Sequence, residues 1–180
     1  DTAVKAVHQF FFHTAQTIEV FAFGAGTIGG TMIDQIRDQR EKLLKENVDI
    51  KVLAITTIDG MILKEDGIDL SNWRDQMKKP DFPFGPQNVD DIIKFVKEKK
   101  PLNPVFVDCT ASYDLPERYL DILNAGMSIA TPNKRANSMD INFYHELRRT
   151  ANKMHRRFLY ETNVGAGLPI IDTLQNLYKS

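Results

Sequence analysis

Hydrophobic positions along this chain alternate between short continuous runs and helical repeats. The runs Ile18–Phe23 and Lys51–Thr56 are compact and apolar, which predicts two buried strands. Between them, from Ile28 to Leu44, apolar residues recur at helical spacing, with Asp, Gln, Arg and Lys on the other face. The two strands begin about 30 residues apart, which is the length of one βαβ unit.

The same alternation continues along the rest of the chain. Residues 59–87 are less regular, so we expect a long insertion there, with a short helix that begins at a Ser71 N-cap and ends by Lys79. Further strands are expected at Pro104–Asp108, Met127–Thr131 and Phe158–Glu161. Further helices are expected at residues 3–13, 88–100, 115–124 and 137–156, and from Pro169 onward.

Strands that alternate with helices in this way predict a fold class. We expect an α/β domain with a doubly wound, mostly parallel sheet of the Rossmann type, covered by helices on both faces. In open sheets of this kind, ligands bind outside the carboxyl ends of the strands. Polar and glycine-rich segments that directly follow a strand are therefore the first candidates for function.

Composition narrows the classes of partner. The chain has 180 residues, with 23 Lys plus Arg against 24 Asp plus Glu, and this balance argues against a nucleic-acid or membrane-surface partner. Its one cysteine, Cys109, excludes an intramolecular disulfide framework and a cysteine-rich zinc site. No apolar run approaches the roughly 20 residues that span a bilayer. No secretory signal is visible, so a cytoplasmic location is expected, and the start at Asp1 indicates a chain cut from something longer.

The most specific local motif is the glycine-rich turn after the first strand. Its sequence GAGTIG is G-x-G-x-x-G, with a strand before it and an amphipathic helix after it. In dinucleotide-binding domains the first glycine allows the tight turn, the second lets the backbone approach the pyrophosphate, and the third lets the helix pack closely. A purely structural turn is the alternative, but the context favours dinucleotide binding. The expected cofactor-binding residues are Gly24, Ala25, Gly26, Thr27, Ile28 and Gly29.

The choice between NAD and NADP stays open at this point. NAD enzymes of this fold often carry an acid at the end of the second strand, which holds the ribose 2′-hydroxyl. Here that strand ends at Thr56 and Thr57, and Asp59 follows a few residues later than expected. No arginine stands there, although Lys64 could reach a 2′-phosphate.

Three more polar segments follow predicted strands. Residues 108–112 include Thr110 and Ser112, which could cap the next helix or contact a cofactor. Lys134 follows a proline-fixed turn, where its ammonium would lie in the cleft; a solvated surface lysine is the alternative. The loop 161–168 has one acid and two glycines, which suits either a hard-cation site or a hinge between domains. Cys109 is interpreted as a small packed residue rather than a nucleophile.

Taken together, four segments resemble the homoserine dehydrogenase family, whose members interconvert aspartate semialdehyde and homoserine with NAD(P)(H). They are VFAFGAGTIGG, VDCTAS, ATPNKRANS and YETNVGAGLPII, and they follow one another through almost the whole chain. The first residues, DTAVKAVHQFF, look like the junction before the dehydrogenase half of bifunctional aspartokinase–homoserine dehydrogenases. Alternatives are a non-catalytic dinucleotide-binding, redox-sensing module, or a different NAD(P)-dependent semialdehyde dehydrogenase.

The resemblance implies roles for matching positions. NAD or NADP would be bound by the glycine turn together with Thr110, Ala111 and Lys134, and Lys134 would also lie beside the reacting carbonyl as a catalytic residue. A sodium ion would be held by Glu161 and by backbone carbonyls, which are those of Val164, Ala166 and Leu168.

The resemblance also implies a domain organisation. Residues 1–16 would be a linker helix, 17–160 the NAD(P)-binding domain, and 161–180 the start of the catalytic and dimerisation domain. In the family, the substrate-binding acids and the proton-donating lysine lie beyond this segment. We therefore expect this chain to bind the cofactor without full catalysis, and the full-length protein to be a homo-oligomer that acts in threonine and methionine biosynthesis.

Overall fold

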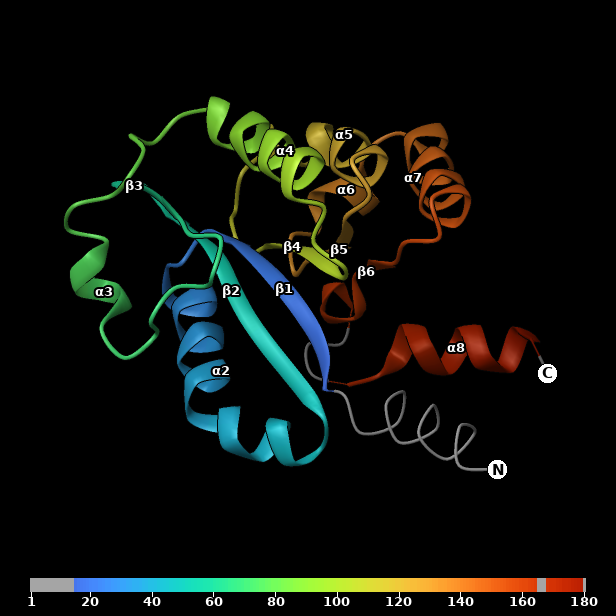
Figure 1. The fold of residues 1–180 in the computed structure, drawn as a ribbon. Helices are drawn as coiled ribbons and strands as arrows, with labels where there is room; N and C mark the ends of the chain where they lie inside the picture. The colour runs from blue at the N-terminus through green and yellow to red at the C-terminus, as the bar shows by residue number, and fades with distance from the viewer. Residues whose placement is uncertain (1–14, 165–167, 180) are drawn as a thin grey trace.

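The fold is built on one six-stranded sheet, seen here in a computed structural model that describes residues 15–164 and 168–179 (Figure 1). The strand order is β3-β2-β1-β4-β5-β6, and all neighbouring pairs are parallel except the antiparallel pair β2–β3. This confirms the doubly wound, mostly parallel sheet. The strands are β1 (Gln16–Phe23), β2 (Val48–Thr57), β3 (Gly60–Leu63), β4 (Pro104–Asp108), β5 (Ser128–Ala130) and β6 (Phe158–Leu159).

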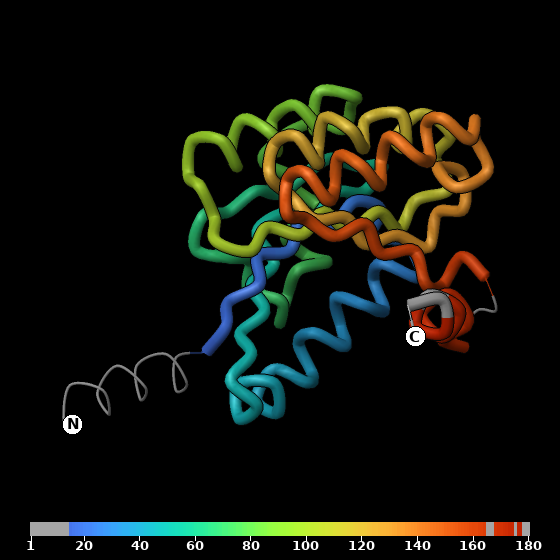
Figure 2. The backbone as a smooth tube through the Cα atoms, turned by 90° about the vertical axis from the view of Figure 1, so that its right-hand side faces the viewer, coloured from blue at the N-terminus to red at the C-terminus, as the bar shows by residue number. Residues whose placement is uncertain are grey.

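Helices cover both faces of the sheet. Figures 1 and 2 show α4, α5, α6 and α7 together on one face, with α2 on the opposite face. The helix α8 follows the 3-10 turn η2 and stands beside the end of the sheet (Figure 1). The helices and 3-10 turns are α2 (Thr27–Lys45), α3 (Trp73–Gln76), α4 (Gln87–Lys99), η1 (Leu115–Arg118), α5 (Tyr119–Asn124), α6 (Arg135–Ser138), α7 (Ile141–Lys153), η2 (Glu161–Asn163) and α8 (Ile170–Lys179).

The central strand β1 is apolar because both of its faces are buried. Val20 and Ala22 belong to one core cluster, on the side of the sheet that α2 covers. Phe21 and Phe23 alternate with them and belong to the other cluster, which includes Tyr119 and the apolar side of α4. Alternating side chains point to opposite faces of a strand, so a strand with two covered faces reads as a continuous hydrophobic run.

The strand β3 lies within the segment that we expected to be an irregular insertion, so that expectation was wrong in part. A two-residue turn, Ile58–Asp59, joins β2 to β3, and Thr57 pairs with Gly60 across it. Two-residue connections are typical of antiparallel hairpins. The apolar run of β3 is only three residues long, which is too short to identify a strand by periodicity. Asp59 therefore lies in the hairpin turn, close to the carboxyl end of β2.

The expected single helix over residues 137–156 is instead two helices, α6 and α7. Asp140 separates them, because its side chain accepts a hydrogen bond from the backbone N–H of Asn142 at 2.8 Å and caps α7. Met139 is extended and ends α6. An N-cap aspartate starts a new helix by satisfying one of its free N–H groups. Lys134 directly precedes α6 and occupies the N-cap position of this short helix.

Two smaller boundary predictions also need correction. Asn72, not Ser71, precedes α3, and the Ser71 backbone N–H donates to Asp69. The helix α4 begins at Gln87, and Asn88 is fully buried, with its side chain bonded to the backbone of Gly85. The helix expected at residues 3–13 lies outside the described residues.

Candidate functional site

Two loops diverge from neighbouring strands at the centre of the sheet. The glycine turn follows β1 and the segment Cys109–Ser112 follows β4, and the strand order reverses between these two strands. The strands end level with each other, since Phe23 pairs with Asp108 and the Cys109 N–H donates to the Phe23 carbonyl oxygen at 2.8 Å. A crevice at such a switch point is where open α/β sheets bind ligands.

The three motif glycines of the turn have different surroundings. Gly24 has φ +89°, and a Cβ on it would lie 2.6 Å from Cγ2 of Thr110. A Cβ on Gly29 would overlap the carbonyl oxygen of Gly24, so α2 could not pack as closely. Gly26 differs, because its φ is negative and a Cβ there would meet nothing within 4 Å. Two glycines therefore serve the turn itself, and Gly26 faces open space.

The backbone N–H groups of the turn fall into two sets, one bonded within the protein and one without an acceptor among the described residues. Those of Gly24 and Ala25 both donate to the Thr56 carbonyl oxygen at 3.0 Å. These two N–H groups are therefore bonded within the protein, although both residues line a cavity. The N–H groups of residues 26–29 have no acceptor within the described part of the chain, and they stand at the positive end of α2. Unpaired N–H groups at a helix N-terminus form an anion site.

A cavity of about 570 Å³ opens on the β2 side of the turn. Its lining includes Ile58, Asp59 and Phe84, which we call its outer end, and also Thr110 and Ala111. Sequence reasoning did not find Ile58 and Phe84, because neither belongs to a motif. Lys64, which the sequence suggested for a 2′-phosphate, does not line this cavity, and its ammonium lies 3.0 Å from Asp81.

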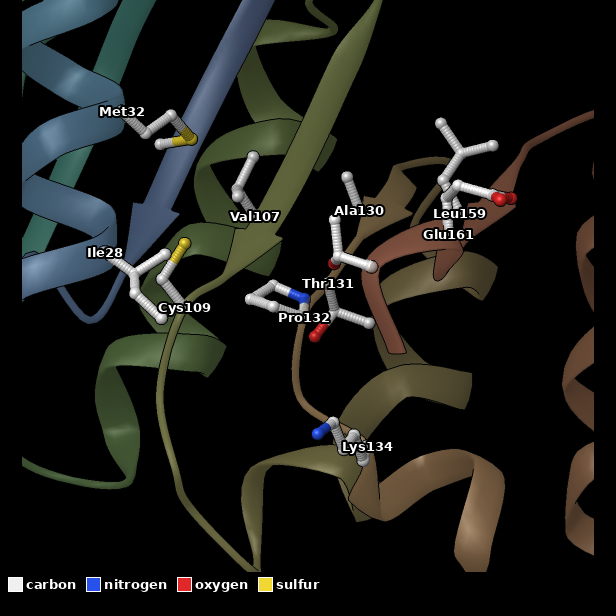
Figure 3. Close-up of a pocket in the computed structure, with 11 residues that line it drawn as sticks. Ile28, Met32, Val107, Cys109, Ala130, Thr131, Pro132, Lys134, Leu159 and Glu161 are labelled. Atoms are coloured by element: carbon white, nitrogen blue, oxygen red, sulfur yellow. The ribbon is translucent and has the colours of Figure 1, made fainter. Parts of the chain in front are cut away.

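A second cavity, of about 650 Å³, opens on the β5 side (Figure 3). Ile28 and Met32 of α2 border it on one side, and Leu159 and Glu161 border it on the other. Lys134 is exposed and lies at one end of it. The walls are mainly apolar with few polar groups, which is the usual make-up of a small-molecule site.

The two cavities meet at Cys109, which lines both. Burial, followed by the charge of Asp108, raises the pKa of this thiol to about 11. A thiol that stays protonated is a poor nucleophile. The expected packing role of Cys109 thus agrees with its surroundings, although the side chain is only partly buried.

A buried carboxylate connects the loop that contains Thr110 with the turn that contains Lys134. The side chain of Asp108 is fully buried, and one oxygen accepts hydrogen bonds from the N–H and the hydroxyl of Thr110, both at 2.7 Å. The other oxygen accepts from the Tyr119 hydroxyl at 2.6 Å and from the Asn133 amide at 3.1 Å. Asn133 directly precedes Lys134, so one carboxylate fixes both the Thr110 loop and the Lys134 turn.

Tyr119 was not identified from the sequence, since nothing in a helical segment marks a tyrosine as part of a polar network. Its hydroxyl also lies 3.1 Å from the Thr131 hydroxyl. Burial, followed by the neighbouring Asp108 charge, raises the pKa of Tyr119 well above its ordinary value. The Ser112 hydroxyl accepts from the N–H of Leu115 at 3.1 Å, but the N-cap position of η1 belongs to Asp114.

The loop after β6 places Glu161 at the edge of the second cavity, in η2 rather than in the strand predicted for it. Its carboxylate oxygens accept from the N–H groups of Ile171 at 2.9 Å and Asp172 at 3.0 Å, in the first turn of α8. The Leu168 carbonyl oxygen accepts from Ile170 at 2.8 Å. Val164 is extended, and Ala166 lies outside the described residues. Within residues 15–164 and 168–179, no cluster of three or more His, Cys, Asp and Glu residues could hold a metal.

Comparison with known proteins identifies the family. Residues 24–161 match the family model "Homoserine dehydrogenase, NAD binding domain". The chain belongs to the homoserine dehydrogenase family. The match begins at the first glycine of the turn and ends at Glu161, so it contains all lining residues of both cavities except Phe23 and Thr162.

Several curated relatives are bifunctional members of the homoserine dehydrogenase family. The chain is 42% identical to the bifunctional aspartokinase/homoserine dehydrogenase of Haemophilus influenzae, over 97% of this chain and 21% of that protein. It is 41% identical to a chloroplastic bifunctional aspartokinase/homoserine dehydrogenase of Arabidopsis thaliana, over 99% of this chain and 19% of that protein. The chain thus spans about a fifth of the length of these relatives.

Solved structures agree with the fold of a homoserine dehydrogenase domain. A hyperthermophilic archaeal homoserine dehydrogenase mutant in complex with NADPH is 26% identical, with a TM-score of 0.70 over 91% of this chain and 50% of that one. A Candida auris protein of unknown function is 28% identical, with a TM-score of 0.77 over 91% of this chain and 44% of that one. Among the described helices, none has the length and apolar character needed to cross a membrane.

Proposed function

We propose that this chain is the NAD(P)-binding part of a homoserine dehydrogenase, within a bifunctional aspartokinase/homoserine dehydrogenase. The parent enzyme would reduce L-aspartate 4-semialdehyde to L-homoserine by hydride transfer. The observation that carries this proposal is the arrangement around Gly26: open space above it, four unpaired N–H groups beside it, and a cavity on each side. The family match supplies the reaction.

The residues around the turn fit a dinucleotide. The N–H groups of residues 26–29 would hold the pyrophosphate. The cavity that contains Asp59 would take the adenosine half, and the cavity that contains Lys134 would take the nicotinamide half. Thr110 and Ala111 line the first of these cavities, and Cys109 lines both. A bound nicotinamide cofactor supplies the hydride, and the protein supplies orientation and electrostatics.

The chain's own residues would prepare the second cavity for carbonyl chemistry. Ile28, Met32 and Leu159 would exclude water from it. The Lys134 ammonium would stabilise the carbonyl oxygen as negative charge develops, which is the role of a preorganised cation in such reactions. Its backbone is held by the neighbouring Asn133, which is bonded to Asp108.

A sodium ion near Glu161 is a further part of the proposal. Glu161 together with the carbonyl oxygens of Val164, Ala166 and Leu168 would give an all-oxygen donor set, which hard cations prefer. Glu161 already caps α8, so an ion would share its oxygens with two backbone N–H groups. Melting curves in sodium chloride and in choline chloride at equal ionic strength test this part. Sodium should raise the melting temperature, and Glu161→Gln should remove the difference.

The remaining parts of the proposal concern the whole protein. We place residues 17–160 in the nucleotide-binding domain and residues 161–180 at the start of the catalytic and dimerisation domain, after a linker in residues 1–16. The parent enzyme would be a homo-oligomer. A cytoplasmic location suits a chain with one free cysteine, although the Arabidopsis relative is described as chloroplastic.

The experiment that tests the central proposal is a titration of the 180-residue chain with NADH and with NADPH, followed by nicotinamide fluorescence. At least one nucleotide should bind. Gly26→Val should abolish binding and leave the far-ultraviolet circular dichroism unchanged, since its side chain would occupy the space above the turn. Thr31→Val places the same side chain on an exposed position of α2 and should bind normally. Unchanged affinity in Gly26→Val would contradict the assignment of the turn.

A further inference from the structure

The outer end of the β2-side cavity has a fixed carboxylate. Asp59 stands in the two-residue turn of the β2–β3 hairpin, and its backbone N–H donates to the Thr57 hydroxyl at 3.1 Å. The same hydroxyl lies 3.5 Å from Oδ2 of Asp59. Both residues line the cavity. The hairpin therefore holds Asp59 at the edge of the sheet where β2 ends. In the sequence, this acid follows the strand a few residues later than the ribose-binding acid of NAD enzymes is expected.

No basic side chain lines this cavity among the described residues. Two cations from neighbouring segments, Lys64 and Arg74, already have partners. Lys64 is paired with Asp81, whose other oxygen accepts from the Leu63 backbone N–H at 3.2 Å. Arg74 lies near the first turn of α2, but both ends of its guanidinium bond to Asp34, at 2.8 and 2.6 Å. Arg74 also lies 4.3 Å over the Trp73 ring.

Two exposed apolar side chains flank the acid. Ile58 is 86% exposed and Phe84 is 53% exposed, and both line the cavity. Exposed apolar side chains at a cavity rim suit the flat faces of a purine. The outer end thus combines apolar surface for a base with a carboxylate that can accept hydrogen bonds from a sugar diol.

We propose that Asp59 selects NAD(H) over NADP(H) in this domain. Its carboxylate accepts hydrogen bonds from the free ribose hydroxyls of NAD(H), and it repels the 2′-phosphate of NADP(H), which finds no free cation there. This inference rests on the proposed function, since it names the nucleotide that the site takes. Hydrogen bonds to a charged group, once lost, weaken binding by about tenfold or more.

Dissociation constants of the 180-residue chain for NADH and NADPH, from the same fluorescence titration, test the inference. NADH should bind at least about tenfold more tightly. Asp59→Ala should weaken NADH by about tenfold and leave NADPH unchanged or slightly tighter. Asp66→Ala removes the same charge from an exposed position outside this cavity and should leave the ratio of the two constants unchanged.

A gain-of-binding variant gives an independent readout. Ile58→Arg places a cation beside the proposed 2′-position on a highly exposed residue, and it should tighten NADPH at least severalfold. Wild-type protein that binds NADPH as tightly as NADH would overturn the inference and leave the proposed function intact. A selective loss of NADPH affinity in Arg74→Gln would also overturn the inference and leave the proposed function intact, because Arg74 would then bind the 2′-phosphate. Failure of both nucleotides to bind would overturn the inference together with the proposed function.

Discussion

The hydroxyl of Tyr119 donates a hydrogen bond to Oδ2 of Asp108 at 2.6 Å, and both side chains are fully buried. A buried carboxylate is costly unless donors surround it. Here four donors do so, and two of them come from Thr110, which follows the central strand β4. The fourth comes from Asn133, beside Lys134. The geometry of the Thr110 loop and of the Lys134 turn therefore depends on one buried carboxylate.

Removal of the phenol hydroxyl should destabilise the fold. In Tyr119→Phe the carboxylate keeps its charge and loses its shortest donor, so the free energy of unfolding should fall by about 1–3 kcal/mol. Urea denaturation followed by circular dichroism measures the loss. Tyr113→Phe is the control, because Tyr113 is 68% exposed, and its effect should stay within about 0.5 kcal/mol. Equal stabilities of the two variants would show that the buried bond contributes nothing.

The same tyrosine predicts how stability depends on pH. Its pKa is raised in the folded chain from an ordinary value of 10.0, so the folded state holds this proton more tightly than the unfolded state does. The corresponding stability is fully present below about pH 10 and is lost as the pH rises above it, by up to about 1.4 kcal/mol per pH unit. Denaturation curves between pH 8 and pH 11 should show a steeper decline for wild type than for Tyr119→Phe. Parallel declines would contradict the prediction.

Cys109 should react slowly with alkylating reagents. Its pKa is raised from 9.0 to about 11, and reactivity follows the thiolate fraction, so alkylation by iodoacetamide at pH 8 should be about 100-fold slower than in a cysteine peptide. The chain has one cysteine, which makes mass spectrometry unambiguous. The urea-unfolded chain should react at the ordinary rate. Bound nucleotide should slow the reaction further, because Cys109 lines both cavities.

Alanine at Gly29 should destabilise the fold, whereas alanine at Gly26 should leave its stability unchanged. A Cβ on Gly29 would overlap the Gly24 carbonyl oxygen, which is backbone and cannot move aside, so Gly29→Ala should lose about 1–3 kcal/mol of stability. Gly26→Ala meets nothing within 4 Å and should stay within about 0.5 kcal/mol of wild type. Thermal and urea unfolding check both. If Gly26→Ala were the less stable variant, the described turn geometry would be incorrect.

Lys134 should matter for catalysis and little for stability. In the intact enzyme that we propose, Lys134→Met should lower kcat by about 10²–10³, which is typical when one oxyanion-stabilising group is removed. Lys153→Met is the matched control, because Lys153 is exposed at the end of α7, and its kcat should be normal. Steady-state kinetics and cofactor titrations separate a loss of kcat from a loss of binding. A normal kcat in Lys134→Met would remove this residue from the reaction.

Sequence patterns were sufficient for the parallel strands of the sheet and for the glycine turn, because both depend on local rules. Val20 to Phe23 form a continuous apolar run because two layers cover the strand, and Gly24 follows directly with a φ of +89°. Four segments, the glycine turn among them, resembled one family, which the comparisons confirmed.

Other features depend on contacts between distant residues, so local patterns could not give them. The Tyr119–Asp108 bond joins residues of different elements across the core. Asp59 reaches the cavity only because a three-residue apolar run pairs with β2. Asp140 divided one expected helix into two, although an aspartate within a polar segment is not distinctive. Glu161 was expected as a cation ligand, and its helix-capping contacts became visible only in three dimensions.

Glu161 belongs at once to the wall of the second cavity and to the start of α8. Its two carboxylate oxygens hold the N–H groups of Ile171 and Asp172. A substitution of Glu161 would therefore alter a cavity wall and the start of a helix together.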